Sequence, residues 1–174
     1  MLTKPARDIS AGAVKYGPAI LTLNIRGLRT KTEHIKTLFT RRHCDFVLLQ
    51  ETNMTTQYEQ GLMHKLGLKG DRGHFMNSKN SFCNGTGIIQ TSNRWEIKEK
   101  GGGLDGRLAS VDVTDGKAWF TIVSLYAPSG LDVGLKGAFF EDVDTWIKNH
   151  ARHPLILGGD FNCTLDDRDV VGYV

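Results

Sequence analysis

The feature that most constrains this chain is that its apolar residues occur in short runs. Residues 19–25 (AILTLNI), 45–50 (DFVLLQ) and 154–159 (PLILGG) each have the length of a buried strand. None of these runs approaches the roughly 18 apolar residues that a membrane-spanning helix requires. Segments with helical spacing lie between the runs, so the alternation predicts sheets covered by helices in one α/β (α+β) unit.

Three segments carry apolar residues at helical intervals. A capping-box spacing of Thr30 and Glu33 precedes the first and predicts a helix start there. The apolar positions are Ile35, Leu38 and Phe39; Tyr58, Leu62 and Leu66; and Phe139, Phe140, Val143, Trp146 and Ile147. These spacings predict three helices, in keeping with a fold in which helices cover sheets.

The middle of the chain has the pattern of β-structure. Residues 87–90, 107–113 and 118–125 are β-like, and the Thr-Asp-Gly sequence between the last two predicts an antiparallel hairpin. Residues 69–84 are polar and contain glycines, so we expect an exposed loop there. We expect the glycine run at 101–103 at a flexible hairpin tip, because it lacks the Lys-Ser/Thr ending of a phosphate-binding loop.

Composition indicates one globular domain. The chain has 174 residues, of which 40% are hydrophobic and 24% charged, and we assign residues 19–174 to the domain and residues 1–18 to a disordered segment. The net charge of +3 permits an anionic partner. Three cysteines without a C-x-x-C spacing favour a reducing compartment, and the opening residues lack the apolar core of a secretory signal. We therefore expect an intracellular protein without a membrane segment.

Two carboxylates are the first chemical signal. Glu51 follows the apolar run in LLQET, and Asp160 follows the run in ILGGDFN, so both should emerge at strand ends, where sites form. One or two carboxylates, completed by water and substrate phosphate, suffice for Mg²⁺. The alternative is that each acid merely ends its strand or caps a helix, and position alone leaves both readings open.

Amide and phenol groups stand at similar positions. Asn24 and Asn162 are also polar residues at predicted strand ends, and Gln50 precedes Glu51, so an amide-rich rim could surround a metal and donate to phosphate oxygens. Tyr126 ends the strand of the predicted hairpin and could contact the same phosphate. A turn or backbone cap is the alternative for a single Asn, and simple packing is the alternative for the tyrosine.

Taken in order, TLNIRGL, LLQET, SLYAPS and GGDFNCTLDDRD resemble the endonuclease/exonuclease/phosphatase superfamily, and most closely the apurinic-type endonuclease domain of LINE-type (non-LTR) retrotransposons. The resemblance implies a four-layered α/β sandwich of two mixed sheets flanked by helices. It also implies that Glu51 binds Mg²⁺ or Mn²⁺ and that Asn24 supports that metal site. Tyr126 would contact the phosphate, Asp160 would activate water, and Asn162 would stabilise the transition state.

The resemblance also sets expectations for substrate and completeness. It implies an endonuclease that nicks DNA, in the nucleus, with Gln50 and Arg107 as substrate-binding candidates. The family's late Asp and its final Ser-Asp-His are not found after Asp160, so we expect a C-terminally truncated domain whose sheet a partner chain or a second copy could complete. An inactive fragment or binding module is the main alternative, and a phosphoinositide-type phosphatase is another.

Overall fold

The computed structural model describes residues 17–41, 43–54, 56–78, 84–130 and 133–163. These residues form two four-stranded sheets. Sheet A has the order β1-β2-β4-β3 and consists of β1 (Ile20–Asn24), β2 (Phe46–Gln50), β4 (Thr86–Gln90) and β3 (Gly73–Met76). Sheet B has the order β5-β6-β7-β8 and consists of β5 (Glu96–Gly103), β6 (Leu108–Thr114), β7 (Trp119–Tyr126) and β8 (Leu155–Asp160).

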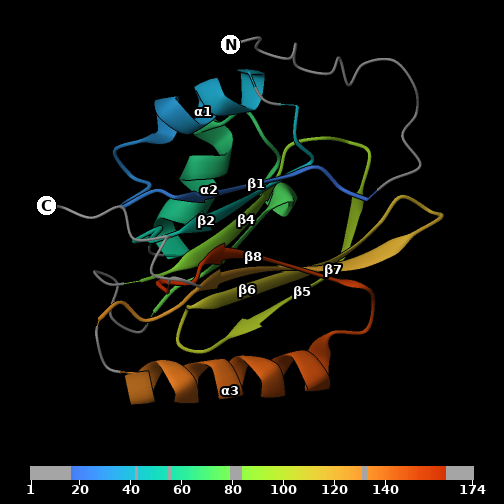
Figure 1. Ribbon diagram of the computed structural model, residues 1–174. Coiled ribbons are helices and arrows are strands. Elements are labelled where there is room, and N and C mark those ends of the chain that lie inside the picture. Colours follow the sequence, from blue (N-terminus) through green and yellow to red (C-terminus); the bar gives the residue numbers. More distant parts are fainter. Residues whose placement is uncertain (1–16, 42, 55, 79–83, 131–132, 164–174) are drawn as a thin grey trace, which may run out of the picture.

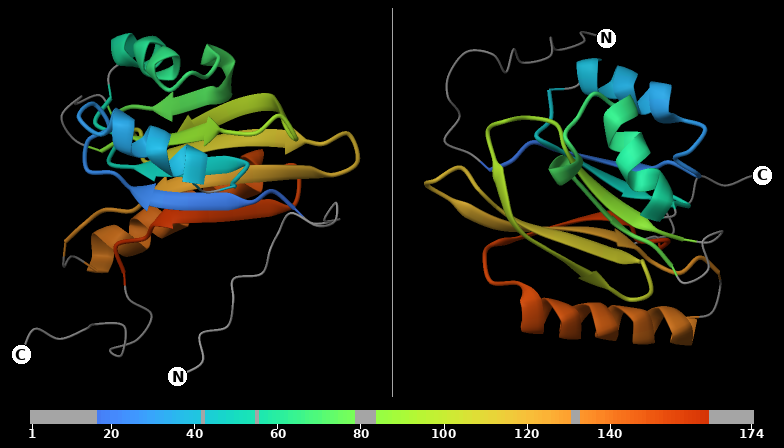
Figure 2. Two further views of the ribbon diagram at one scale, coloured as in Figure 1. Left: turned by 90° about the horizontal axis from the view of Figure 1, so that it is seen from above. Right: turned by 180° about the vertical axis from the view of Figure 1, so that it is seen from behind.

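The two sheets lie face to face between helices. Figure 1 shows α1 (Thr32–Arg41) and α2 (Thr56–Lys65) on the outer side of sheet A, and α3 (Val133–His150) on the outer side of sheet B. The views in Figure 2 show the same four layers. In each sheet one pair of strands is parallel and the other pairs are antiparallel. The predicted four-layered sandwich with two mixed sheets is therefore confirmed.

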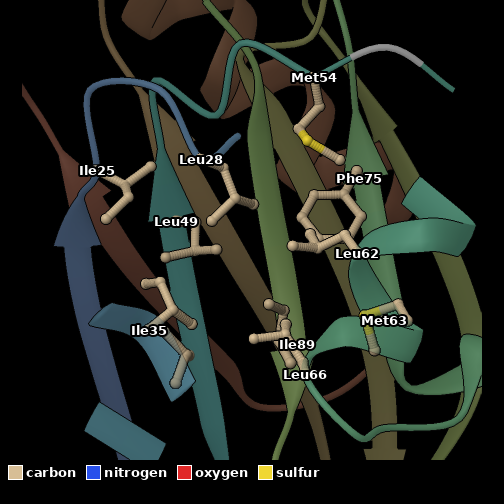
Figure 3. Packing of buried hydrophobic residues seen from close by; sticks show 11 residues of the cluster. Ile25, Leu28, Ile35, Leu49, Met54, Leu62, Met63, Leu66, Phe75 and Ile89 are labelled. Carbon is tan, nitrogen blue, oxygen red and sulfur yellow. The ribbon is translucent and has the colours of Figure 1, made fainter. Parts of the chain in front are cut away.

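Three apolar clusters hold these layers together. The cluster between sheet A and its helices includes Ile35 of α1, Leu62 of α2 and Leu49 of β2 (Figure 3). The cluster between the sheets includes Phe46 and Ile122, both fully buried. The third lies between sheet B and α3, and its members are Leu108, Val123, Leu125, Ala127, Phe139, Val143 and Trp146. The helical spacings in the sequence thus mark the faces that cover the sheets.

Strand β3 lies where the sequence predicts a loop. The polar segment contains a 3-10 turn (η1, Gly70–Arg72) followed by β3, which pairs antiparallel with β4. The prediction of a loop throughout residues 69–84 is wrong, because Phe75 inserts its side chain into the apolar cluster beneath α2 and is only 6% exposed. One buried aromatic in a short strand was not enough to stand out against the surrounding polar residues. Residues 79–83 lie outside the described part of the chain.

The glycine run also differs from its prediction. Gly101, Gly102 and Gly103 end strand β5 and pair with β6, so they precede the hairpin turn and do not form its tip. A Cβ atom at Gly102 would lie 2.5 Å from the Met76 side chain and 2.6 Å from the Leu108 carbonyl oxygen. The run is glycine-rich because neighbouring atoms approach the strand closely.

Each sheet presents one edge on the same side of the sandwich. Strand β1 pairs only with β2, and β8 pairs only with β7, among the described strands. The two edges lie next to each other, since β1 contacts β8 across the layers. No helix in the described part of the chain is both long and apolar enough to cross a bilayer. Residues 1–16 of the segment expected to be disordered lie outside the described residues, and that expectation stays a prediction.

Candidate active site

The carboxyl ends of four strands meet at one end of the sandwich. Strands β1 and β2 run parallel in sheet A, and β7 and β8 run parallel in sheet B. The polar residues that end or directly follow these strands are Asn24, Glu51, Tyr126 and Asp160. Because β1 and β8 are neighbours across the two layers, all four side chains reach a common place.

The side-chain amide of Asn24 joins the two carboxylates. Its Nδ2 donates to Glu51 Oε1 at 2.8 Å and to Asp160 Oδ2 at 2.7 Å. Its Oδ1 accepts a hydrogen bond from the backbone N–H of Arg26 at 3.2 Å, which fixes the orientation of the amide. The Tyr126 hydroxyl donates to the same Glu51 Oε1 at 3.2 Å. One network therefore connects a carboxylate from each sheet.

This donor set suits a hard cation. Glu51 and Asp160 supply carboxylate oxygens only, and none of the ion pairs found among the described residues involves either of them. Oxygen donors are those that Mg²⁺ and Mn²⁺ prefer, and Mg²⁺ commonly takes one or two carboxylates and keeps several waters. Among the described residues, no set of three or more His, Cys, Asp or Glu side chains could enclose a metal.

Backbone strain is concentrated at this end of the molecule. In the described part of the chain, the non-glycine residues with positive φ are Arg26, Glu51, Asn53, Asn84, Leu104, Asp105 and Asn162. All lie in the loops at the end where the four strands converge. Such residues cost about 1–3 kcal/mol each and persist where surrounding contacts enforce them. For Glu51, at φ 52°, the enforcing contact is a hydrogen bond from the Gly27 N–H to the Glu51 carbonyl at 2.7 Å.

Two glycines set the position of Asp160. Gly158 faces sheet A, where an added Cβ would lie 2.9 Å from a methyl group of Leu48. Gly159 has a φ of 152°, and a Cβ there would overlap the backbone of Leu125. The Gly-Gly-Asp sequence therefore lets β8 approach both the facing sheet and β7 before the carboxylate emerges.

Asn162 lies beside Asp160 but its amide is held elsewhere. The Asn162 N–H donates to Asp160 Oδ1 at 3.0 Å, and the side-chain Nδ2 donates to the Ala127 carbonyl at 2.8 Å. Lys136 of α3 donates through Nζ to the Asn162 carbonyl at 2.6 Å. Asn162 thus orients the carboxylate through its backbone, while its side chain ties the β8 loop to the end of β7.

Gln50 bridges the two sheets. The residue is 1% exposed, and its Nε2 donates to the Ser124 hydroxyl of β7 at 3.1 Å. Its Oε1 accepts a hydrogen bond from the Thr22 hydroxyl at 3.4 Å, and the Ser124 hydroxyl in turn donates to the Leu49 carbonyl at 3.2 Å. This buried link positions the end of β2, and with it Glu51, against sheet B.

Arg107 packs on Tyr126. Its guanidinium carbon lies 5.1 Å from the centre of the Tyr126 ring, and Nη1 donates to the Tyr126 carbonyl at 3.3 Å. Burial raises the pKa of the Tyr126 hydroxyl, and the charge of Glu51 and the hydrogen bond to it raise the pKa further. Arg107 lowers this pKa and Asp160 raises it. The phenol is therefore held in its protonated, hydrogen-bond-donating form.

An open hollow lies over this network. Its lining residues are Thr22, Leu23, Asn24, Gln50, Gly159, Asp160, Phe161, Asn162 and Cys163. The structure thus brings Asn24, Gln50, Asp160 and Asn162 to one hollow. Glu51 and Tyr126 do not line this hollow but belong to the same hydrogen-bond network.

Sequence reasoning missed three neighbours of this site. Ser124 was visible as a polar residue in an otherwise apolar strand. Arg26, within the TLNIRGL motif, and Arg29, directly after it, are exposed on the loop that bonds to Glu51 through the Gly27 N–H. Two arginines within five residues of a strand-end Asn were the available signal.

One family of known proteins matches most of this chain. Residues 21–172 match the model of the Endonuclease/Exonuclease/phosphatase family. The chain belongs to this family. It is 30% identical over 155 residues to the Xenopus laevis "Transposon TX1 uncharacterized 149 kDa protein", a match that covers 87% of this chain and 11% of that protein. The chain therefore spans about a tenth of that relative's length.

Solved structures share the fold of this family member. An AP endonuclease from Archaeoglobus fulgidus has a TM-score of 0.68 at 18% identity, over 88% of this chain and 60% of the other. A variant of the 3′ phosphatase NExo from Neisseria, bound to a product DNA hairpin, has a TM-score of 0.65 at 20% identity, over 88% and 61%. D. rerio TDP2, complexed with a single-strand DNA product, has a TM-score of 0.63 at 19% identity, over 84% and 61%. At sequence identities of 18–20%, this structural similarity establishes the fold alone.

Proposed function

We propose that this chain carries the site of a Mg²⁺- or Mn²⁺-dependent endonuclease that nicks DNA, of retrotransposon origin. The observation that carries the proposal is the pair of carboxylates, Glu51 and Asp160, that one Asn24 amide holds together across two sheets. The transposon relative supports the origin, and the DNA in two of the similar solved structures supports the substrate.

Each residue of the hydrogen-bond network would have its own role in the reaction. Glu51 would hold the ion together with water, with Asn24 as the donor that fixes its carboxylate. When bound, such an ion stabilises the negative charge that develops on a transferring phosphoryl group. Asp160, whose Oδ1 accepts the Asn162 N–H, would orient the attacking water and take up its proton.

The remaining site residues would act on the phosphate. Tyr126 has a raised pKa, so its hydroxyl can donate to a phosphate oxygen in place of Glu51. The Asn162 amide would donate to the transition state after leaving the Ala127 carbonyl. The guanidinium of Arg107, which packs on the Tyr126 ring, would contact the DNA backbone. Gln50, the remaining substrate-binding candidate, lines the hollow, although its amide is engaged between the sheets.

A basic rim supports nucleic acid as the substrate class. Arg26 and Arg29 are exposed on the loop that follows β1. The guanidinium of Arg29 lies 3.9 Å from the ring centre of Tyr58, whose side chain is 42% exposed. The backbone of this loop bonds to Glu51 through the Gly27 N–H at 2.7 Å. Exposed cations and an exposed aromatic ring on and around this loop suit a polyanionic backbone that carries bases. Action on chromosomal DNA would place the protein in the nucleus.

The adjoining edges of β1 and β8 support association with a partner chain or a second copy. Strand β5, at the other side of sheet B, carries the charged residues Glu96, Lys98 and Lys100, which discourage strand pairing. Strand β8 has no charge before Asp160, and Leu155 at its start is 37% exposed. Light scattering should show an associated species that Leu155→Lys converts to monomer; a wild-type monomer would oppose self-association.

The decisive experiment is a supercoiled-plasmid nicking assay with Mg²⁺, Mn²⁺ or EDTA. Glu51→Gln keeps an acceptor for Asn24 and removes the charge, whereas Glu33→Gln alters an exposed glutamate of α1 and serves as the matched control. We expect metal-dependent nicking by the wild type and by the control, and loss of at least about a hundredfold in Glu51→Gln. A folded wild type that binds DNA without nicking it would favour the alternative of an inactive binding module.

A parallel assay of phosphate release from a soluble inositol phosphate tests the alternative of a phosphoinositide-type phosphatase. Phosphate release without plasmid nicking would favour that alternative over the DNA endonuclease.

A further inference from the structure

A second hollow lies on the outer face of sheet B, beside α3 and away from the strand ends that carry the carboxylate network. Figure 1 shows α3 crossing this face. The floor is made by β5, β6 and β7, with Gly101, Ser110 and Asp112 among its residues, and Trp146 of α3 forms one wall. Glu99 and Arg152 stand at the rim. The proposed nuclease chemistry uses none of these residues.

The hollow exists because position 101 is glycine. Gly101 and Ser110 are direct partners in the β5–β6 register, so they lie on the same face of the sheet. A Cβ at Gly101 would lie 2.9 Å from Ser110 Oγ and 3.9 Å from the Trp146 ring. Any other residue would therefore fill the space between the serine and the indole. The glycine run of the sequence thus has a second consequence, which is to open this space.

The floor is polar and its residues are largely buried. Ser110 is 6% exposed, and among the described residues no hydrogen bond of its side chain is found. Asp112 is 9% exposed; its Oδ1 accepts a hydrogen bond from the Thr121 hydroxyl at 2.7 Å. The nearest basic group to its Oδ2 is His153 Nε2, at 3.9 Å. Neither Ser110 Oγ nor Asp112 Oδ2 belongs to the fully buried side-chain atoms that lack a partner, so both oxygens are accessible from the hollow and can accept a hydrogen bond from a ligand.

Carboxylates outnumber guanidinium groups in the hollow. Glu99 and Asp112 bring two carboxylates, and Arg152, whose Nη1 lies 3.2 Å from Glu99 Oε2, brings one guanidinium. The imidazole of His150 also lines the hollow and stacks on the Trp146 indole, with 4.8 Å between the ring centres. With histidine counted as neutral, the hollow has one excess negative charge, opposite in sign to the net charge of +3 of the whole chain. Apolar surface is provided by the Trp146 indole, against which the aliphatic stem of a ligand could lie.

We propose that this hollow binds the ammonium group of an alkylamine. The ammonium would donate to Asp112 Oδ2 and Ser110 Oγ, and the alkyl chain would lie along Trp146 toward the open rim. An ammonium fits because it has three donors and no acceptor, which complements a floor of acceptors. The amine can come from a lysine side chain or from a free polyamine. Comparing the binding of a lysine derivative with the binding of putrescine distinguishes these two sources.

The test is a titration of the ¹⁵N-labelled chain followed by NMR. The probes are N-acetyl-lysine methylamide, putrescine, and N-acetyl-norleucine methylamide, which keeps the stem and lacks the ammonium. We expect saturable shifts of the Trp146 indole N–H and the Ser110 amide with at least one amine, and none with the norleucine probe. If the shifts saturate with only one of the two amines, that amine shows whether the ligand is a lysine side chain or a free polyamine. Equal shifts with the norleucine probe, or no shifts with either amine, would overturn the proposal.

Matched variants test the assigned contacts. Asp112→Asn keeps the acceptor for the Thr121 hydroxyl and removes the charge, so amine affinity should fall about tenfold or more. Asp142→Asn, on the exposed side of α3, should bind as the wild type does. Gly101→Ala should abolish binding by filling the space. Unchanged affinity in a folded Asp112→Asn would assign the shifts to another place and refute the site.

Discussion

Replacing Asn24 by aspartate removes the contact that joins the two halves of the candidate site while keeping the size of the side chain. The substitution removes two N–H donors, at 2.8 Å from Glu51 and 2.7 Å from Asp160, and adds a third negative charge. Hydrogen bonds to charged acceptors contribute about 1.5–3 kcal/mol each. Since these residues are half-buried, solvent screening favours the lower end, and two bonds then give about 3 kcal/mol.

A loss of this size is a large share of the roughly 5–15 kcal/mol that stabilises a domain. The assay is urea unfolding followed by circular dichroism, first in EDTA and then with Mg²⁺. We expect Asn24→Asp to be about 3 kcal/mol less stable than the wild type in EDTA. Mg²⁺ should restore more stability to the variant than to the wild type, because a third carboxylate strengthens the attraction for a cation.

Asn149→Asp, on the exposed face of α3, is the matched control and should change stability by no more than about 0.5 kcal/mol. The reasoning is refuted if Asn24→Asp is as stable as the wild type in EDTA. Equal stabilisation of both proteins by Mg²⁺ would leave the amide bridge intact but would refute a cation site between these carboxylates.

Three further predictions concern the scaffold. Gly159→Ala should destabilise by more than about 3 kcal/mol because its Cβ overlaps the backbone of Leu125, while Gly61→Ala, in open space on α2, should stabilise by about 0.5–1 kcal/mol; thermal melts compare them. Phe75→Ala should cost about 3–4 kcal/mol in urea unfolding if β3 is anchored as described, and a change below about 1 kcal/mol would contradict that anchoring. Burial lowers the pKa of His74 from 6.5, its hydrogen bond to Gly101 raises it, and Lys100 lowers it. Stability should therefore be complete above about pH 6.5 and fall as the pH drops toward the lowered pKa; unfolding at about pH 5 and pH 7 should show a smaller difference in His74→Gln.

The site could be anticipated from the sequence to the extent that it depends on strand ends. A short apolar run followed by a polar residue identifies the end of a strand, and this placed Asn24, Glu51, Tyr126 and Asp160 at strand ends. The order of the motifs then indicated a family, which the match over residues 21–172 establishes. Strand ends follow from local sequence, and the order of the motifs is read along the chain. A single sequence therefore contains the information for both.

Other elements depended on contacts that no local pattern contains. Strand β3 is anchored by Phe75, which packs into the apolar cluster beneath α2. The glycines of β5 are needed because Met76 and Ser110 approach them closely. Gln50 stays a predicted substrate-binding residue, and only the structure shows that its amide also donates to Ser124 of the other sheet. In each case the deciding partner belongs to a distant segment, and a window of sequence does not include it.

The sequence alone determined the alternation of strands and helices and the polar residue at each strand end, because hydrophobic periodicity follows from local backbone geometry. Only the tertiary structure decided that Asn24 and Asp160, separated by 136 positions, share a hydrogen bond of 2.7 Å. That contact requires two sheets to stack with β1 facing β8, and stacking is set by the packing of apolar side chains across the whole domain.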